Sequence, residues 1–234
     1  MSKLELSPRL AAIAAQVPQG ARLADIGTDH AYLPTALLLA GRIERAVASD
    51  VREGPLQRGR ETARHYGQEE NITFRCCDGL EGLTPDQADT VVIAGMGGEL
   101  IARILSQALW TREARLLLQP MTGQPALRRW LVENGYCIQR EQIVREGEKF
   151  YVILTVRGGQ SQPYTPAELW VGRQTQGEDN PHRLDYLRDQ LRRRERALAG
   201  MRQSASLQPE DLAREEALLV ELSNLEKEWS AWQR

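Results

Sequence analysis

Cysteine is scarce in this sequence, and long apolar runs are missing. The spacing of its three cysteines, Cys76, Cys77 and Cys137, fits neither a disulfide framework nor a zinc site. We therefore expect no metal and a reducing, cytoplasmic setting. No stretch of about eighteen apolar residues occurs, and the first ten residues lack the apolar core of a signal peptide. The sequence thus predicts a protein that is neither exported nor membrane-spanning.

Net charge is also small, at a formal value of -2, but it is unevenly distributed. Residues 182–202 contain seven arginines and three acidic residues, so a basic face is compatible with the balanced total. Hydrophobic residues make up 41% and charged residues 26% of the 234 positions, which excludes wholesale disorder. The length accommodates one full-sized domain and a smaller appendage.

Short apolar strands alternate with helical segments along the first half of the chain. Strands are expected at residues 22–26, 46–50, 72–76, 90–94 and 114–119, and helices at residues 8–15, 31–40, 54–66 and after Gly98. Ser7 and Pro8 supply an N-cap and a first helical residue for the first helix. This alternation predicts a parallel sheet with helices on both faces.

The alternation stops after Trp130. Residues 136–145 and 149–157 are two extended runs separated by a Glu-Gly-Glu turn, which predicts an antiparallel hairpin. A mostly parallel seven-stranded sheet with an antiparallel hairpin at its edge is typical of class I methyltransferases. We therefore predict an α/β, Rossmann-like fold of that class.

A linker-like segment, Gly-Gly-Gln-Ser-Gln-Pro, occupies residues 158–163. It divides the chain into an expected catalytic domain, residues 1–160, and a C-terminal domain, residues 161–234. In the second domain, apolar residues recur at helical spacing, at Leu184, Leu187, Leu191, Leu198 and Met201 and again at Leu218, Leu222, Leu225, Trp229 and Trp232. This pattern predicts an α-helical hairpin whose apolar stripes form its core.

Glycines are missing where a nicotinamide-binding loop needs them. A dinucleotide site has glycines at every second position after the first strand, whereas this chain has Gly27, Asp29 and Ala31. S-adenosylmethionine has no phosphate and presents a cationic sulfonium, to which a carboxylate is complementary. We therefore expect Asp25, Gly27 and Asp29 to bind S-adenosylmethionine, and Thr28 or Asp29 to cap the next helix.

Further candidate cofactor residues follow the next three strands. Asp50 closes the second strand, where an acid accepts hydrogen bonds from ribose hydroxyls. Asp78 and Gly79 follow the third strand, a common place for contact with adenine. The fourth strand is followed by a glycine-rich run that implies close backbone approach to a ligand; its candidate residues are Ala94, Gly95, Met96 and Gly97.

These motifs together resemble a known family. The segment Asp-Ile-Gly-Thr-Asp-His-Ala-Tyr-Leu-Pro at residues 25–34, the segment Ile-Ala-Gly-Met-Gly-Gly at residues 93–98, and Leu-Gln-Pro at residues 118–120 are similar to those of the TrmK family. That family comprises bacterial tRNA (adenine-N1)-methyltransferases that act at tRNA position 22, with a coiled-coil-like C-terminal domain. Two departures occur: Ser49-Asp50 replaces a common Gly-Glu pair, and Met121 replaces a common asparagine.

The resemblance implies a tRNA partner and a methyl transfer that leaves adenine positively charged. Asp29 is the candidate for stabilising that charge, with His30 and Tyr32 as second choices for orienting or stacking on a flipped base. Arginines are the candidate phosphate contacts, Arg9 near the cofactor and a set on the first hairpin helix: Arg188, Arg192, Arg193, Arg194, Arg196 and Arg202.

The residues alone leave other functions open. A class I methyltransferase of a small molecule or a protein fits the same cofactor motifs, and so does a non-catalytic RNA-binding protein that holds S-adenosylmethionine. No obligate protein partner is evident in the sequence.

Overall fold

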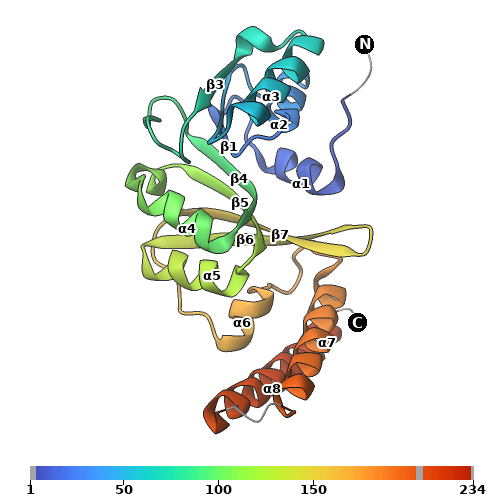
Figure 1. Cartoon of the computed structure of the whole chain (residues 1–234). Helices are drawn as coiled ribbons and strands as arrows, with labels where there is room; N and C mark the ends of the chain where they lie inside the picture. Colours follow the sequence, from blue (N-terminus) through green and yellow to red (C-terminus); the bar gives the residue numbers. More distant parts are fainter. Residues whose placement is uncertain (1–3, 204–207, 233–234) are drawn as a thin grey trace. The chain divides into compact units, whose positions relative to one another are not determined.

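The computed structural model describes residues 4–203 and 208–232, and the chain divides into two units, Met1–Gln162 and Pro163–Arg234. The strands of the first unit are β1 (Leu23–Ile26), β2 (Ala46–Asp50), β3 (Ile72–Cys76), β4 (Thr90–Gly97), β5 (Arg115–Thr122), β6 (Tyr136–Glu146) and β7 (Lys149–Gly158). They form one sheet in the order β3-β2-β1-β4-β5-β7-β6 (Figure 1). The neighbours from β3 to β5 are parallel, and β7 is antiparallel to both β5 and β6. The predicted methyltransferase-type sheet is confirmed.

Helices cover both faces of this sheet. They are α1 (Pro8–Gln16), α2 (Tyr32–Leu39), α3 (Glu53–His65), α4 (Gly98–Ser106) and α5 (Gln124–Glu133). The first three helices share one apolar cluster with the strands, in which Ile13, Leu37 and Ala63 join Val92 of β4. Neighbouring side chains of a strand point to opposite faces, so Val91 and Ile93 face the other layer, where α4 and α5 lie against β4 and β5.

The helix α5 was not expected from the sequence. Its apolar stripe is short, with Leu127 and Leu131 as its buried aliphatic residues, and it follows a glycine in the left-handed region, Gly123 at φ 68°. Pro125 stands in its first turn, a position at which proline is tolerated because that N–H needs no helical partner. A short helix between two strands thus completes the predicted alternation.

The start of α2 corrects one expectation. We predicted that Thr28 or Asp29 would cap this helix, but the N-cap position belongs to Ala31, and no side chain caps it. Ala31 has φ 51°, a left-handed conformation that is rare for a residue with a side chain. Its methyl group is buried and packs toward Gly59 of α3, so tertiary packing sets the entry into the helix. The carboxylate of Asp29 is therefore not engaged in capping.

The second unit contains α6 (Pro166–Val171), α7 (Arg183–Met201) and α8 (Pro209–Ala231). The helices α7 and α8 lie side by side (Figure 1). Their ion pairs join Arg188 to Glu226 and Arg202 to Glu216, which shows that they run antiparallel. Most of the predicted apolar stripe is buried, at Leu184, Leu187, Leu191, Leu198, Leu218, Leu222 and Trp229. The predicted helical hairpin is confirmed.

The short helix α6 was missed by the sequence analysis, although its signal is present. Thr165 and Glu168 form a capping box, in which each side chain accepts a hydrogen bond from the other residue's backbone N–H. Within the described part of the chain, no helix is long and apolar enough to cross a membrane.

Candidate active site

A cavity of about 600 Å³ opens at the carboxyl edge of β1 and β4 in the first unit. Ligands bind at this edge in open α/β sheets, because the loops after successive parallel strands meet there. Five of the predicted cofactor residues line the cavity, namely Asp25, Gly27, Asp29, Ala94 and Gly95. The predicted catalytic residues His30 and Tyr32 and the predicted RNA contact Arg9 line it as well. The structure thus brings together residues from positions 9 to 95.

Asp25 is the buried acid of this cavity, with 8% of its surface exposed. Burial raises the pKa of its carboxyl group to about 6, because removal from water disfavours the charged form. A positively charged ligand next to it would favour ionisation. Asp25 is therefore suited to bind a positively charged ligand, which would stabilise its ionised form.

Asp29 is the exposed acid at the cavity, and Arg58 of α3 holds it. Arg58 Nη2 donates to Asp29 Oδ1 over 2.6 Å, and two-thirds of the Asp29 side chain is exposed. This hydrogen bond is the main cause that keeps the pKa of Asp29 below its usual value. Asp29 is consequently a carboxylate under all conditions in which a methyl transfer would be measured.

His30 and Tyr32 form an aromatic pair beside Asp29. Their rings stack with centroids 5.0 Å apart and an interplanar angle of 3°. His30 Nε2 lies 3.6 Å from Asp29 Oδ2, and Tyr32 is 41% exposed. The exposed Tyr32 ring is therefore available for stacking.

The glycines of the site allow close approach of backbone segments. Gly27 has φ 74°, and a Cβ atom there would overlap the terminal methyl group of Met96. Gly95 has φ 81° at the end of the apolar part of β4, and a Cβ atom there would lie 3.6 Å from Arg9 Nη1. Met96 and Gly97 continue the strand beyond the cavity lining, and Gly97 is the N-cap residue of α4.

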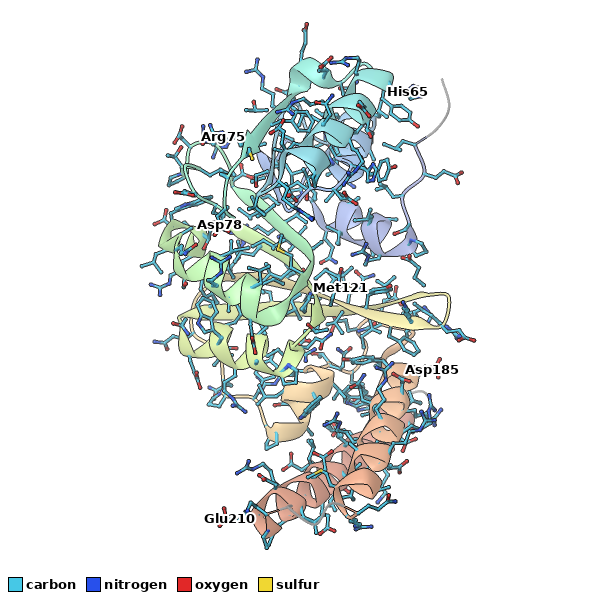
Figure 2. All side chains as sticks on the ribbon, viewed as in Figure 1. His65, Arg75, Asp78, Met121, Asp185 and Glu210 are labelled. Carbon is cyan, nitrogen blue, oxygen red and sulfur yellow. The ribbon has the colours of Figure 1, made fainter. Side chains whose placement is uncertain are left out.

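Asp50, Asp78 and Gly79 lie outside the cavity lining, at neighbouring strand ends. Asp50 Oδ1 accepts from the Arg52 backbone N–H over 2.9 Å. Asp78 lies next to α4 (Figure 2), and Arg103 donates to both of its carboxylate oxygens, at 2.9 and 3.2 Å. This pair lowers the pKa of Asp78. Gly79 has φ 57°, and its carbonyl oxygen accepts from the Ser49 hydroxyl over 3.2 Å.

Two residues near the cavity escaped the sequence analysis of function. Gln119 of β5 is fully buried and accepts a hydrogen bond from Arg9 Nη1 over 2.6 Å. Glu146, at the end of β6, lines the cavity and accepts from the Arg9 backbone N–H over 3.3 Å. A signal for Gln119 exists in the sequence, because a polar residue ends the apolar run Leu-Leu-Leu of β5 at the ligand-binding edge.

The predicted RNA-binding arginines of α7 are mostly paired with acids in the second unit. Arg188 and Arg202 bind Glu226 and Glu216 of α8 at 2.8 and 2.7 Å. Others contact Asp189 on their own helix, Arg192 at 3.7 Å and Arg193 at 2.7 Å. Arg194 lies 3.5 Å from Glu215 and over the Trp170 ring. Among the described residues, the exposed Arg196 makes no ion pair.

The cavity and its neighbouring strand ends fit S-adenosylmethionine. The cavity presents the carboxylates of Asp25 and Asp29 to a ligand that carries an ammonium group and a sulfonium group. Gly27 has a positive φ that glycine adopts readily, and its lack of a Cβ atom leaves room for the terminal methyl group of Met96. Asp50 keeps its second carboxylate oxygen available for a hydroxyl donor.

Comparison with known proteins agrees with this assignment. The family described as "Methyltransferase domain" matches residues 6–154. The tRNA (adenine(22)-N(1))-methyltransferase of Bacillus subtilis (strain 168) is 38% identical over 161 residues, which cover 68% of each chain. The crystal structure of the B. subtilis tRNA methyltransferase TrmK is 31% identical, with a TM-score of 0.78 and coverage of 98% of this chain and 99% of that chain. The Streptococcus pneumoniae protein Sp1610 in complex with S-adenosyl-L-methionine is 35% identical, with a TM-score of 0.81 and coverage of 93% and 99%.

The sheet order, the acidic site and the matched domain define a class I methyltransferase that uses S-adenosylmethionine. Identity above 30% over two-thirds of both chains shows the family. The chain belongs to the TrmK family of tRNA (adenine(22)-N(1))-methyltransferases, as its motifs predicted.

Proposed function

We propose that this chain transfers a methyl group from S-adenosylmethionine to N1 of the adenine at position 22 of tRNA. The observation that carries this conclusion is the 38% identity to the B. subtilis enzyme. Four residues of the motifs that resemble this family, Asp25, Gly27, Asp29 and Gly95, line one cavity. Family membership supports the substrate, and the positions of these residues support the roles proposed for them.

The cofactor is held at the carboxyl ends of β1 and β2 in this proposal. When bound, S-adenosylmethionine supplies a methyl group on a positively charged sulfur. Asp25 offers its buried carboxylate to the cationic end, and Asp50 offers an oxygen to the ribose hydroxyls. Asp78 and Gly79, at the next strand end, border the adenine side, with Arg103 holding the Asp78 carboxylate in place.

Asp29 acts on the target base through its charge. The N1 atom of adenine carries its lone pair in the ring plane, so no proton has to be removed before attack, and alignment dominates the rate. The base gains a positive charge as the new bond forms, and a fixed carboxylate stabilises that charge. Asp29 meets this need because Arg58 keeps it ionised.

His30 and Tyr32 orient the flipped base. A base that leaves an RNA stack needs an aromatic surface to replace the stacking that it loses. The parallel rings of this pair place one such surface next to Asp29. In this arrangement the aromatic pair would hold the base by stacking, beside the Asp29 carboxylate that stabilises the charge gained at N1.

The arginines of α7 bind tRNA phosphates in this proposal, together with Arg9. An exposed ion pair contributes only about 0–1 kcal/mol, so a phosphate readily replaces the carboxylate partner. Arg188 and Arg193 are held in exposed pairs of this kind, and the exposed Arg196 makes no ion pair among the described residues. A tRNA substrate also supports a cytoplasmic location. That the enzyme needs no protein partner stays a prediction.

The activity is tested with purified protein, labelled S-adenosylmethionine and an unmodified tRNA transcript. We expect label on the adenine at position 22, detected as a stop in reverse transcription, because a methyl group at N1 blocks base pairing. A matched transcript with guanine at position 22 should remain unlabelled. Label at another nucleotide, or equal labelling of both transcripts, would contradict the assigned position.

A further inference from the structure

Gln119 joins three segments that meet at the cavity. Its Oε1 atom accepts hydrogen bonds from Arg9 Nη1 over 2.6 Å and from the Gly95 backbone N–H over 3.2 Å. Its Nε2 atom lies 3.5 Å from the sulfur of Met121 (labelled in Figure 2), the residue that departs from the family's asparagine. Gln119 is fully buried, so it does not touch a substrate itself. Its influence on the reaction must pass through its neighbours.

Arg9 is the neighbour whose charge matters most. Its guanidinium lies over the Tyr151 ring, 5.4 Å from the centroid, and its backbone N–H donates to Glu146. Within residues 4–203 and 208–232, the Arg9 side chain makes no ion pair with a carboxylate. Its Nε atom is buried without a hydrogen-bond partner. The cavity therefore contains a cation that the described part of the chain orients but does not neutralise.

Because Arg9 has no carboxylate partner among the described residues, its guanidinium is available to bind an anion. The sulfonium of the cofactor and the methylated adenine are both positive, so an arginine in the same cavity would repel them. Both substrates also carry anionic oxygens, on the RNA phosphates and on the amino-acid carboxylate of the cofactor. Because the Gln119 side chain is neutral, it holds Arg9 without competing for that anion. A carboxylate in its place would form a salt bridge with Arg9.

We propose that Gln119 is a positioning residue that keeps Arg9 free of a carboxylate and aimed along Gly95, so that Arg9 binds an anionic oxygen of a substrate inside the cavity. The same amide fixes the backbone of Gly95, whose φ of 81° only glycine adopts readily. This inference rests on the proposed methyl transfer. A buried, neutral side chain thus controls Arg9, the one arginine that lines the cavity within residues 4–203 and 208–232.

The test replaces Gln119 with Glu in the full chain, a change that preserves shape and the acceptor oxygen. Because the introduced carboxylate would pair with Arg9, anion binding should weaken about tenfold, as when a charged hydrogen bond is lost. If the anion is an RNA phosphate, the KM for tRNA rises and its dependence on salt decreases, while the Kd of S-adenosylmethionine is unchanged. If the anion is the cofactor carboxylate, the Kd of S-adenosylmethionine, measured by calorimetry, rises instead.

A double-mutant cycle with Arg9→Gln separates positioning from general damage. In the Arg9→Gln background, Gln119→Glu should change neither constant more than about twofold, because the residue through which it acts is gone. Gln119→Leu provides a second variant, in which Arg9 and Gly95 both lose their hydrogen-bond acceptor. It should weaken binding of the same substrate that Gln119→Glu affects. An effect of Gln119→Glu that persists in full without Arg9, or no effect on either substrate, would overturn the proposal.

Gln142→Leu is the matched control. Gln142 of β6 accepts a hydrogen bond from the Gln16 amide of α1 over 2.9 Å, so it also ties α1 to the sheet, but it does not line the cavity. This variant should lower the melting temperature slightly and leave both binding constants as they are. The Kd of S-adenosylmethionine is measured without RNA. If the wild-type chain fails to methylate tRNA, the proposed function is refuted, but the Kd values of the double-mutant cycle still test the role of Gln119.

Discussion

The two units of the molecule differ in whether they bury charged side chains. Beside several exposed ion pairs, the sheet unit buries Asp25 at the cavity and the pair Arg128–Glu141, whose atoms lie 2.7 Å apart with 0% and 2% of the side chains exposed. In the helical unit, ion pairs such as Arg188–Glu226 are partly or largely open to water. The number of charged residues is therefore a poor guide to function, since the surroundings of each charge decide what it does.

This contrast has an energetic basis. A buried charge that loses its partner keeps the full cost of its removal from water, whereas an exposed charge regains hydration. The sheet unit thus holds Asp25 and the Arg128–Glu141 pair in one geometry. In the helical unit, exposed pairs such as Arg188–Glu226 can exchange a carboxylate for another anion at little cost.

The variant Arg128→Met tests this contrast and should have the largest effect. Because it leaves Glu141 buried without this partner, we expect a loss of about 3–5 kcal/mol in the free energy of unfolding, measured by urea titration. The companion variant Arg188→Met removes an exposed pair and should cost less than about 1 kcal/mol. Equal losses from the two variants would show that burial does not distinguish these pairs.

A test of the site itself is Asp29→Ala. We expect kcat to fall by about 100- to 1000-fold, the usual effect of removing one group that stabilises transition-state charge. The melting temperature should hardly change, because the side chain is largely exposed. Asp29→Asn, which keeps the shape and removes the charge, should lose about as much activity. Near-normal turnover of either variant would remove Asp29 from the mechanism.

The sequence predicted the sheet and the cavity edge well because both depend on local patterns. Apolar strands and glycine-bearing loops are visible in windows of ten residues, and candidate residues from the loop after β1 and from β4 line one cavity. The helix cap at Thr28 or Asp29 was wrong because the packing of Ala31 against α3, about thirty residues away along the chain, sets that backbone.

Other features depend on contacts between distant positions, so the sequence did not reveal them. Arg58 meets Asp29 across 29 positions, and Arg9 meets Gln119 across 110 positions. The sequence shows that α7 is rich in arginine. Acids of α8 pair with several of these arginines, and the sequence of α7 alone does not indicate those pairs.

A smaller effect is expected from Asp25→Asn, which tests the buried acid. The folded state holds a proton on Asp25 up to about pH 6, whereas an unfolded chain releases it near 3.8. The folded state therefore binds more protons between these values, and wild-type stability falls as pH rises through that window, by about 3 kcal/mol in total. The variant should lack this loss, as thermal melts from pH 3.5 to 8 would show.

Cofactor binding gives the second measurement on the same variant. A cationic ligand requires the ionised form, so wild-type affinity for S-adenosylmethionine should fall about tenfold for each pH unit below 6. Asp25→Asn should bind more weakly at pH 8 and show no such dependence. If wild type and variant follow the same pH profile, Asp25 does not face the cofactor's positive charge.

The smallest effects, and the sharpest test of the exposed pairs, come from Arg196→Gln and Arg188→Gln. Both remove one positive charge from α7, but phosphate binding by Arg188 must first displace Glu226. We expect Arg196→Gln to weaken tRNA binding several-fold and to reduce the salt dependence of binding by about one phosphate contact. Arg188→Gln should have a smaller effect on both the affinity and its salt dependence. Glu226→Gln releases Arg188 and should strengthen binding. If all three variants bind tRNA as wild type does, with the Kd of S-adenosylmethionine unchanged, these α7 charges serve the helical hairpin alone, and tRNA must be held elsewhere.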